Sequence, residues 1–310
     1  MRCVFLSGIQ RSGKTLTQLL LSSHPEIIIS PGTKVIARLL FRHPRSRPLT
    51  ADEILGVRRA LQKDRRFKAW RVNHGLYLKL IEGYTEVTSR QAVLDLMSFF
   101  RDQIKPAASI IGNKKGYYCL ETDVVKRVIP EAKFVFVIRD SRGAVSSMLE
   151  TQPEHDIYSA SLTWRLKAQR IRMAQEQFPD DVFVLRYESL VRDPERLCRE
   201  MCSFLGLEYS PLMLTDYRTN DAVRHATDTT HPETFEEITT SMIDEWRHRL
   251  DAAQVRVIEG LTCRELSELG YELSDHRPRS VLEDLRYKWM QGRHFLEWWW
   301  WHAQASQRVG

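Results

Sequence analysis

The sequence is poor in cysteine and has neither a C-x-x-C pair nor a long apolar run. An odd number of cysteines, five, is scattered over 310 residues, which excludes a disulfide framework and a zinc knuckle. No window approaches the roughly 18 apolar residues of a membrane span. The first apolar run covers only residues 3–6, short of the roughly 7–15 residues in the core of a signal peptide. We therefore expect a chain of a reducing compartment, the cytoplasm, in which Cys198 and Cys202 are core residues.

Glycine and proline are too scarce for a fibrous or disordered protein. The chain has 14 Gly and 12 Pro, with 43% hydrophobic and 28% charged residues, which predicts a folded globular protein. We find no internal repeat and no Gly/Ser linker, so we expect one domain over residues 1–275. Lys and Arg exceed Asp and Glu by six, and this excess favours anionic partners. A nucleic acid is not expected among them, and the oligomeric state is left open.

Three short apolar runs have the pattern of strands buried on both faces. They cover residues 3–6, 134–138 and 182–185. A helix should follow the first run from Lys14, and another should follow the second from near Gly143. Strand, loop and helix in repetition predict an α/β fold with a central parallel sheet flanked by helices. Further helical stretches are expected over residues 33–110 and 150–180.

The loop after the first predicted strand carries a phosphate-binding pattern. Residues 8–15 read GIQRSGKT, which satisfies G-x-x-x-x-G-K-T in a strand–loop–helix context. Small residues allow successive backbone N–H groups to converge on an anion, and the following helix adds its positive end. The loop therefore predicts an anion site in a P-loop-like domain. The candidate binding residues are Arg11, Ser12, Gly13, Lys14, Thr15 and Leu16.

One interpretation of this loop is an ATP-dependent P-loop kinase acting on a small molecule. Lys14 would then contact the β- and γ-phosphates, and Thr15 would bind magnesium. Such an enzyme also needs an acidic residue at the end of a neighbouring strand. Asp140 follows a suitable strand, but Arg139 precedes it within a longer pattern that indicates another chemistry.

That longer pattern consists of seven short motifs spread in order over residues 3 to about 273. They are RSGKTL (11–16), SHPE (23–26), FVFVIRDSRGAVSSM (134–148), RYESL (186–190) with DPE (193–195), FLGL (204–207), WR (246–247) and LGYE (269–272). Together they resemble the PAPS-dependent sulfotransferases, and are most similar to the tyrosylprotein and bacterial carbohydrate-type branches. The resemblance implies transfer of a sulfuryl group from 3′-phosphoadenosine 5′-phosphosulfate (PAPS), with release of PAP.

The resemblance also assigns roles at the 5′-phosphosulfate. It places Arg11 against the sulfuryl group, where a fixed guanidinium stabilises developing charge without reorganisation. Lys14 departs from the family, which usually has Thr there. The pair Asn113-Lys114 matches an Asn-Lys pair whose lysine contacts the bridging oxygen, so Lys114 is the second expected catalytic residue. For Lys115 the alternative is a solvated position on a loop.

A second set of residues is implied at the 3′-phosphate and the nucleoside. Arg139 and Ser147 match the family's 3′-phosphate site, which ATP, lacking that phosphate, would leave unused. Tyr187 corresponds to an aromatic residue near the nucleotide, and Ser241 falls in a late loop that closes over it. No metal is expected, because sulfuryl transfer carries less negative charge than phosphoryl transfer and cationic side chains can suffice.

The general base is missing from its implied place. The tyrosylprotein branch carries a Glu shortly after the His-Pro pair, but residues 30–33 here read SPGT, without a carboxylate. His74 and His155 are candidates, since the ordinary pKa of histidine suits proton abstraction, although each is more ordinary as a surface or packing residue. A non-catalytic polyanion- or membrane-binding protein is thus a third hypothesis.

Two basic regions bear on the acceptor. Residues 38–71 hold eleven Lys and Arg against three acidic residues, as either a solvated helix face or a cradle for an acidic acceptor, phospholipid or polyanion. Residues 276–310 form an aromatic-rich C-terminal appendage with five of the eight Trp and six Lys and Arg. Trp beside Arg suits a membrane interface, a tail folded on the domain or an oligomer contact. We expect an acceptor hydroxyl on a glycan or glycolipid, with peripheral membrane contact.

Overall fold

The computed structural model describes residues 2–42, 47–152, 154–220 and 236–274, which cluster into two compact units. Unit 1 consists of the described residues within 1–8, 13–137 and 174–238. Unit 2 consists of those within 9–12, 138–173 and 239–310. Each unit is described by itself. The tail predicted over residues 276–310 lies outside the described residues, and the domain boundary at residue 275 stays a prediction.

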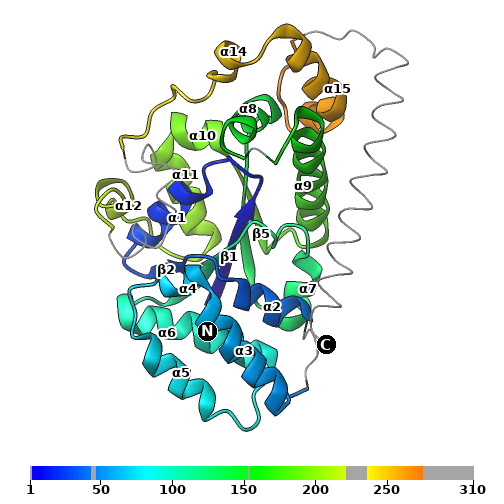
Figure 1. Cartoon of the computed structure of the whole chain (residues 1–310). Helices are drawn as coiled ribbons and strands as arrows, with labels where there is room; N and C mark the ends of the chain where they lie inside the picture. Colours follow the sequence, from blue (N-terminus) through cyan, green and yellow to red (C-terminus); the bar gives the residue numbers. More distant parts are fainter. Residues whose placement is uncertain (1, 43–46, 153, 221–235, 275–310) are drawn as a thin grey trace. The chain divides into compact units, whose positions relative to one another are not determined.

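A five-stranded sheet with the order β2-β3-β1-β4-β5 runs through unit 1 (Figure 1). Strand β1 runs parallel to β3 and to β4, and β2 runs parallel to β3. Parallel neighbours require crossover connections, which helices supply here. This arrangement confirms the predicted α/β fold. The strands are β1 (Arg2–Gly8), β2 (Ile27–Ser30), β3 (Ile110–Lys114), β4 (Lys133–Ile138) and β5 (Val182–Arg186).

The first strand–loop–helix segment follows the sequence pattern. All of β1 after Arg2 is buried, as expected for a central strand with neighbours on both edges. Helix α1 (Lys14–Ser23) begins at the predicted residue and buries its leucines. It ends where His24 N–H bonds the Leu21 carbonyl at 3.1 Å, directly before Pro25, which cannot continue a helix.

Strands β2 and β3 were not predicted by the sequence pattern. Strand β2 has only four residues, and β3 contains Gly112 and the polar pair Asn113-Lys114. A Cβ on Gly112 would lie 2.8 Å from the Val4 carbonyl oxygen, so glycine permits the close approach of β1 and β3. The sequence signal of β3 is weak because backbone proximity, not a run of apolar side chains, determines it.

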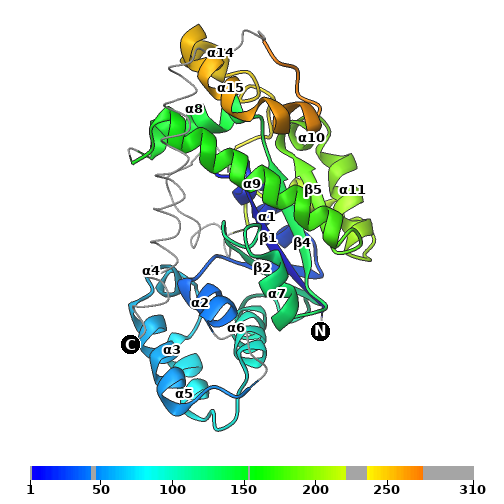
Figure 2. The ribbon, with the colours of Figure 1, turned by 90° about the vertical axis from the view of Figure 1, so that its right-hand side faces the viewer.

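The stretch from residue 33 to residue 110 is helical, as predicted. Figure 2 shows its helices gathered together in unit 1. They are α2 (Lys34–Arg42), α3 (Ala51–Lys63), α4 (Arg65–Lys68), α5 (His74–Glu82) and α6 (Ser89–Ile104). Besides α1, the other described helices that lie wholly in this unit are α7 (Thr122–Val128), α10 (Tyr187–Arg192), α11 (Pro194–Phe204) and α12 (Leu212–Thr215).

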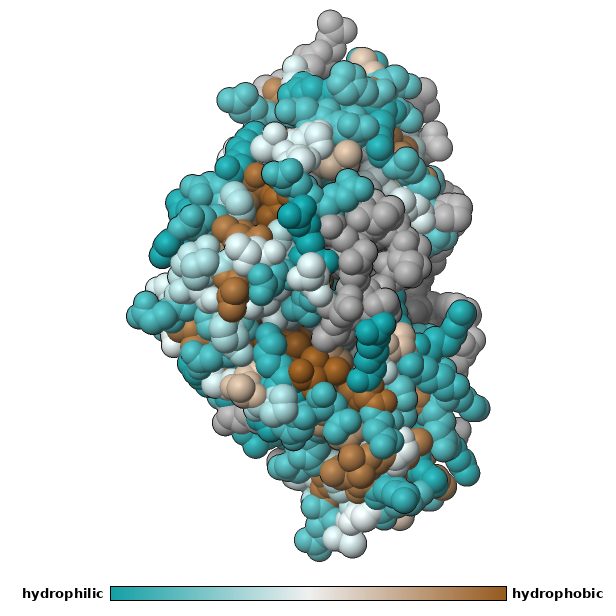
Figure 3. Space-filling view, turned by 90° about the vertical axis from the view of Figure 1, so that its left-hand side faces the viewer, coloured by the Kyte–Doolittle hydropathy of each residue, from teal (hydrophilic) through white to brown (hydrophobic). Residues whose placement is uncertain are grey.

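Helices α3 and α5 expose some of their leucines. Leu55 of α3 and Leu76 and Leu80 of α5 are among the large apolar side chains with substantial exposure. Figure 3 shows hydrophobic areas among hydrophilic ones in the lower half of the face that carries α5. Single exposed leucines are ordinary on protein surfaces, so this area by itself indicates no partner.

Unit 2 is built from helices. It contains α8 (Ser141–Thr151), α9 (Ile157–Gln177) as far as Met173, α14 (Trp246–Arg249) and α15 (Ala252–Glu268). Val145 and Met148 of α8 pack with Ala160 of α9 and Ile258 of α15 in one buried cluster. Helix α8 begins two residues before the predicted start at Gly143, because the Asp140 carboxylate accepts a hydrogen bond of 2.8 Å from the Arg142 N–H and caps the helix.

Two further sequence expectations concern cysteines and membrane spans. Cys198 and Cys202 are buried on α11, which confirms them as core residues. Among the described residues, no helix combines the length and the hydropathy needed to cross a bilayer.

Candidate functional site

The loop from Gly8 to Gly13 depends on backbone conformations that glycine permits. Gly8 and Gly13 both have positive φ, 133° and 84°. A Cβ on Gly8 would lie 2.1 Å from the Val137 carbonyl oxygen, and one on Gly13 would lie 2.6 Å from Cδ2 of Tyr187. Arg11, with φ of 58°, is the non-glycine residue of the described chain that has positive φ. Such conformations are costly for side-chain-bearing residues and concentrate at ligand-binding turns.

The first turn of α1 has no side-chain cap. Its N-cap is Gly13, which offers no acceptor to the N–H groups of Lys14, Thr15 and Leu16. The Leu16 side chain is buried, so this residue has only its N–H to offer a ligand. Backbone N–H groups at the positive end of a helix attract anions. The anion site predicted for this loop stays a prediction, and the uncapped first turn of α1 is compatible with it.

Lys114 reaches this turn from the neighbouring strand. It is the last residue of β3, in register with Leu6 of β1, and its Nζ donates a hydrogen bond of 3.1 Å to Thr15 Oγ1. The structure therefore brings together two residues that are 99 positions apart in the sequence and that were predicted at the 5′-phosphosulfate. The pairing adds a cation to the N–H groups of the turn.

The backbone before Lys114 is fixed by a buried polar network. Asn113 is fully buried and donates from Nδ2 to Ser30 Oγ at 2.8 Å. The hydroxyl of Tyr118 donates to Asn113 Oδ1, and Ser30 Oγ donates to the Gly112 carbonyl at 2.9 Å. A fully satisfied buried network rigidifies its surroundings, so Lys114 projects from a fixed point.

Tyr187 lies against the same loop. It begins α10, directly after β5, and its ring occupies the space next to Gly13 that a side chain would need. The family resemblance implies an aromatic residue near the nucleotide at this position. The ring packs beside the turn, and the absence of a side chain on Gly13 allows this contact.

In unit 2 the structure brings together Arg11, Ser147 and Arg139. Arg11 Nε donates to Ser147 Oγ at 2.8 Å, and Arg139 Nη1 donates to the Arg11 carbonyl at 3.1 Å. The Arg139 carbonyl accepts from Trp164 Nε1 at 2.9 Å, which anchors its backbone. Arg11 was expected at the sulfuryl group and the other two at the 3′-phosphate, so direct contact between Arg11 and Ser147 is a finding that the sequence did not indicate.

Ser12 and Ser241 occupy different environments in unit 2. Ser12 is fully buried and its hydroxyl donates to the Ile9 carbonyl at 2.7 Å, which holds the loop closed. Ser241 is exposed, and its hydroxyl lies 2.7 Å from Thr239 Oγ1. The next residue, Met242, accepts a hydrogen bond from Arg139 Nη2 through its carbonyl. The late segment therefore contacts a predicted 3′-phosphate residue through its backbone.

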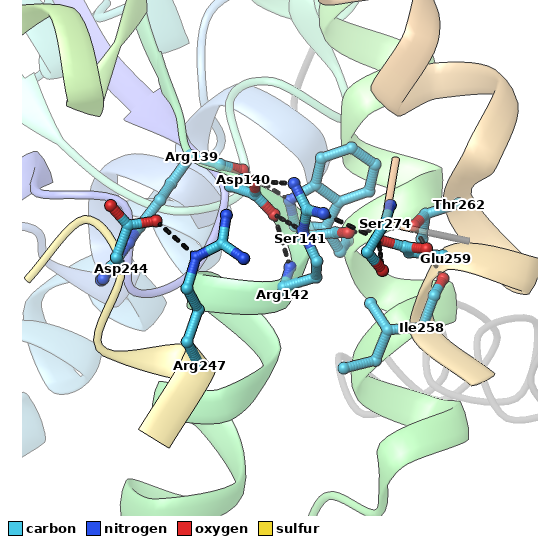
Figure 4. A network of polar contacts seen from close by, with 11 residues as sticks. Arg139, Asp140, Ser141, Arg142, Asp244, Arg247, Ile258, Glu259, Thr262 and Ser274 are labelled. Atoms are coloured by element: carbon cyan, nitrogen blue, oxygen red, sulfur yellow. Dashed lines mark hydrogen bonds and ion pairs between the residues drawn. The ribbon is translucent and has the colours of Figure 1, made fainter. Parts of the chain in front are cut away.

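A buried ionic network surrounds the start of α8 (Figure 4). Arg142 donates from Nε and Nη2 to the two carboxylate oxygens of Asp140, at 2.9 and 2.6 Å. Its Nη1 donates to Glu259 Oε1 at 2.7 Å, and that oxygen also accepts from the Ser274 hydroxyl at 2.8 Å. Asp140, the residue that a kinase would need for its metal, is therefore engaged with Arg142. The D-x-R spacing is the sequence signal that could have indicated this pair.

The two histidines considered as bases have structural contacts. The His74 ring bonds the Phe67 carbonyl through Nε2 at 2.9 Å and packs edge-on against the Phe67 ring. His155 Nδ1 lies 3.5 Å from Ser159 Oγ, one turn further along the chain. Neither arrangement singles out a proton acceptor.

Lys115 is the residue whose position differs most from the sequence interpretation. The solvated loop position considered for it is wrong, because only 9% of the residue is exposed. Burial lowers the pKa of its ammonium to about 8, with further lowering by Arg66 and Lys34 and an opposing effect of Asp64. The buried position follows from packing on Gly32, which no local pattern reveals.

Comparison with known proteins agrees with the geometry. Residues 3–211 match the Sulfotransferase family. A putative protein-tyrosine sulfotransferase of Caenorhabditis briggsae is 22% identical, over 89% of this chain and 91% of that protein. Protein-tyrosine sulfotransferase 2 of Gallus gallus is 26% identical over 69% of this chain, which spans only 53% of the chicken protein.

Solved structures show the same fold. The sulfotransferase domain of the olefin synthase of Synechococcus PCC 7002 superposes with a TM-score of 0.65 and 18% identity, covering 88% of this chain and 95% of that domain. The sulfotransferase domain from the curacin biosynthetic pathway gives 0.64 and 20%, covering 88% and 99%. The family match over residues 3–211 favours the sulfotransferase hypothesis over the kinase alternative. The match over two thirds of its length shows that the chain belongs to the sulfotransferase family of enzymes.

Proposed function

We propose that this sulfotransferase moves a sulfuryl group from PAPS to an acceptor hydroxyl and releases PAP. The observation that carries the proposal is the hydrogen bond of 3.1 Å from Lys114 Nζ to Thr15 Oγ1, at the uncapped first turn of α1. A cation beside the N–H groups of a helix N-terminus suits the 5′-phosphosulfate. Membership of the family supports PAPS as the donor.

At the sulfuryl end, Lys114 is proposed to stabilise the charge that develops on the bridging oxygen as its bond to sulfur breaks. The turn is proposed to hold the 5′-phosphate through its N–H groups. Residues Ser12, Gly13, Lys14, Thr15 and Leu16 form this group, with Tyr187 as the aromatic residue that lies against Gly13.

Arg139 and Ser147 are proposed to bind the 3′-phosphate, a guanidinium and a hydroxyl that together suit a phosphate. Arg11 keeps its proposed role at the sulfuryl group, which requires it to exchange its hydrogen bond of 2.8 Å to Ser147 Oγ for the donor. Ser241 is proposed to close on the nucleotide, since the backbone of Met242 already accepts from Arg139.

Calorimetry tests the donor side. We expect wild type to bind PAP without magnesium and more tightly than Mg·ATP, and Arg139→Ala to lose about 30- to 100-fold in affinity, the value of a charged hydrogen bond. Arg172→Ala, which removes a half-exposed α9 arginine paired with Glu268, is the matched control and should bind as wild type does. Equal binding of PAP by Arg139→Ala and wild type would contradict the 3′-phosphate assignment.

For the acceptor we propose a saccharide or glycolipid hydroxyl, with the basic helices α2, α3 and α4 as the support. A protein tyrosine is the second candidate, because relatives such as the chicken protein are named protein-tyrosine sulfotransferases. Transfer of ³⁵S from labelled PAPS to anionic glycans, to glycolipids and to tyrosine-containing peptides separates the two. Product only with peptides would overturn the saccharide proposal.

The C-terminal segment is proposed to contact a membrane surface, on the strength of its Trp and Arg content. Residues 276–310 lie outside the described residues, so composition alone supports this proposal. Sedimentation with anionic liposomes of the full chain, and of a variant that ends at residue 280, tests it. Unchanged binding after truncation would contradict it.

A further inference from the structure

Lys115 packs where β2 and β3 end, next to the lysine proposed at the bridging oxygen. It follows Lys114 directly, and its Cδ lies 2.9 Å from the place where a Cβ on Gly32 would be. The same Cβ would lie 2.2 Å from the Lys114 carbonyl oxygen. Any residue larger than glycine at position 32 would displace both lysines. The missing side chain of Gly32 therefore makes the space that the Lys115 stem fills.

The charges around Lys115 are mostly of its own sign. Lys34, at the start of α2, and Arg66, on α4, both act on it electrostatically, and Asp64 is the carboxylate that opposes them. Asp64 is already occupied: Oδ2 accepts from the Lys34 N–H at 2.7 Å and Oδ1 from the Arg66 N–H at 2.9 Å. Lys115 Nζ lies 5.7 Å from the centre of the Tyr117 ring, and among the described residues it has no hydrogen-bond acceptor.

Lys105, which is partly buried, shows the contacts of a lysine that has a structural role. Burial lowers its pKa to about 8 as well. Its Nζ, however, donates to the carbonyls of Ser22 and His24, at the end of α1, and of Ile27, at the start of β2. All three contacts use hydrogens of an ammonium. Lys115, at the opposite end of the same pair of strands, has burial and neighbouring cations without such acceptors, and this favours an amine with a free lone pair.

We propose that Lys115 is the proton acceptor for the acceptor hydroxyl. The inference rests on the proposed function and completes it, since no carboxylate stands in residues 30–33. In the step, the hydroxyl oxygen forms a bond to sulfur while the bond between sulfur and the bridging oxygen of PAPS breaks, and PAP leaves with that electron pair. The hydroxyl proton moves to the neutral Nζ of Lys115, which becomes an ammonium and later releases the proton to solvent.

The two adjacent lysines then have different roles, one as a cation and the other as a base. Lys114, bonded to Thr15 Oγ1, works as a cation on the leaving oxygen. Lys115 acts in its neutral form on the incoming oxygen, and burial, with a smaller contribution from the cations Arg66 and Lys34, lowers its pKa to about 8 and so makes that form available near neutral pH. A base with a pKa near the working pH is the most effective proton acceptor.

The test is the pH dependence of kcat/KM for ³⁵S transfer from PAPS, with the tyrosine peptide or saccharide that gives product. We expect wild-type activity to rise through pH 8, and Lys115→Met and Lys115→Arg to lose about 10²- to 10⁴-fold. Lys105→Met is the matched control and should keep the wild-type profile. A Lys115→Met enzyme with the wild-type rate and profile would overturn the proposal.

Chemical rescue separates a base from a cation. In Lys115→Ala, added methylamine or ethylamine should restore activity in proportion to the neutral form of the amine, so rescue should grow with pH. Rescue that follows the protonated form would show that the site needs a positive charge, and would overturn the proposal.

A titration without acceptor keeps the inference distinguishable from the proposed function. In ¹³C-dimethylated protein, the NMR signal absent from Lys115→Met reports the Lys115 pKa, which we expect about two units below that of an exposed lysine. An ordinary lysine pKa would overturn the base assignment even where wild type binds PAP and turns over. Absence of PAP binding and of turnover in wild type would instead overturn the proposed function.

Discussion

Two buried cations, one in each unit, differ in how far nearby carboxylates neutralise their charge. Arg142 in unit 2 contacts two carboxylates and stacks its guanidinium 4.5 Å from the Trp246 ring centre. Lys115 in unit 1 has Asp64 as its opposing carboxylate, against Arg66 and Lys34. The side chain of Arg142 is 6% exposed and the Lys115 residue 9%, so the difference does not come from depth.

Their protonation equilibria shift in opposite directions. Burial lowers the pKa of Arg142, but its hydrogen bonds and charge interactions with Asp140 and Glu259 more than offset this, and the net shift is upward. Burial lowers the pKa of Lys115 to about 8 without such compensation. A neutralised buried charge is a structural element, whereas one left without neutralising partners is destabilising and needs a functional reason.

The largest expected effect is that of Arg142→Met. It leaves the buried carboxylates of Asp140 and Glu259 without their cation, which should cost about 3–5 kcal/mol of unfolding free energy. Urea unfolding measures this. Arg199→Met is the control, since Arg199 and Glu195 form an ion pair with side chains 58% and 54% exposed, and we expect a change within about 0.5 kcal/mol. A loss below about 1 kcal/mol for Arg142→Met would contradict the structural role of Arg142 on which the contrast with Lys115 depends.

Glu259→Gln should have a smaller effect in the same direction. It removes one negative charge but keeps the shape and an acceptor for the Ser274 hydroxyl, and Arg142 retains its two bonds to Asp140. We expect a loss of about 2 kcal/mol, typical of a charged hydrogen bond. Thermal unfolding beside Arg142→Met checks the order. A Glu259→Gln protein less stable than Arg142→Met would show that Glu259, not the cation, organises the network.

The sequence predicts those parts of the fold that local patterns encode. Strands β1, β4 and β5 are short apolar runs, and α1 begins after a glycine-containing loop and ends at a proline. Strand β3 has no such pattern, because the close approach of the Val4 backbone, 108 positions away, requires a glycine at position 112. Tertiary packing decides such elements, and a local window does not contain it.

In the candidate site, too, local patterns predict some residues, whereas tertiary packing decides the positions of others. The anion-binding loop follows from its glycine and lysine spacing, while Lys114, Arg139 and Ser147 came from resemblance to a family. The contact of Arg11 with Ser147 joins residues 136 positions apart, and neither the local sequence pattern nor the family resemblance predicts it. The burial of Lys115 depends on Gly32, on another strand. Adjacent lysines in a sequence look alike, and only packing distinguishes the two.

Lys115→Met should stabilise the protein at neutral pH, the opposite sign from Arg142→Met. With a pKa of about 8 in the folded state and an ordinary value of 10.5 when unfolded, wild type folds at neutral pH with an unfavourable buried ammonium. Replacement by the similarly shaped Met should gain about 1–3 kcal/mol. Denaturant unfolding at a series of pH values measures the difference.

The pH dependence of this gain has a defined sign. Above pH 8 the folded state releases the proton while the unfolded state holds it up to 10.5, so wild-type stability rises relative to Met across that window. The advantage of Met should be full below pH 8 and gone above 10.5. A constant difference at all pH values would attribute it to packing rather than to charge.

The smallest expected effect is that of Lys34→Met on the pKa of Lys115. The Lys34 side chain is exposed and its charge is partly screened, while its N–H remains bonded to Asp64 Oδ2, so the fold should be unaffected. Removing this cation should raise the Lys115 pKa by roughly 0.2–0.5 units. The same NMR titration measures the change, and Arg66→Met should give a larger one. Because a screened charge causes the effect, it should shrink in about 1 M salt. A shift that salt leaves unchanged would mean that Lys34 acts through the position of α2, and Arg66 would then be the cation that distinguishes the surroundings of Lys115 from those of Arg142.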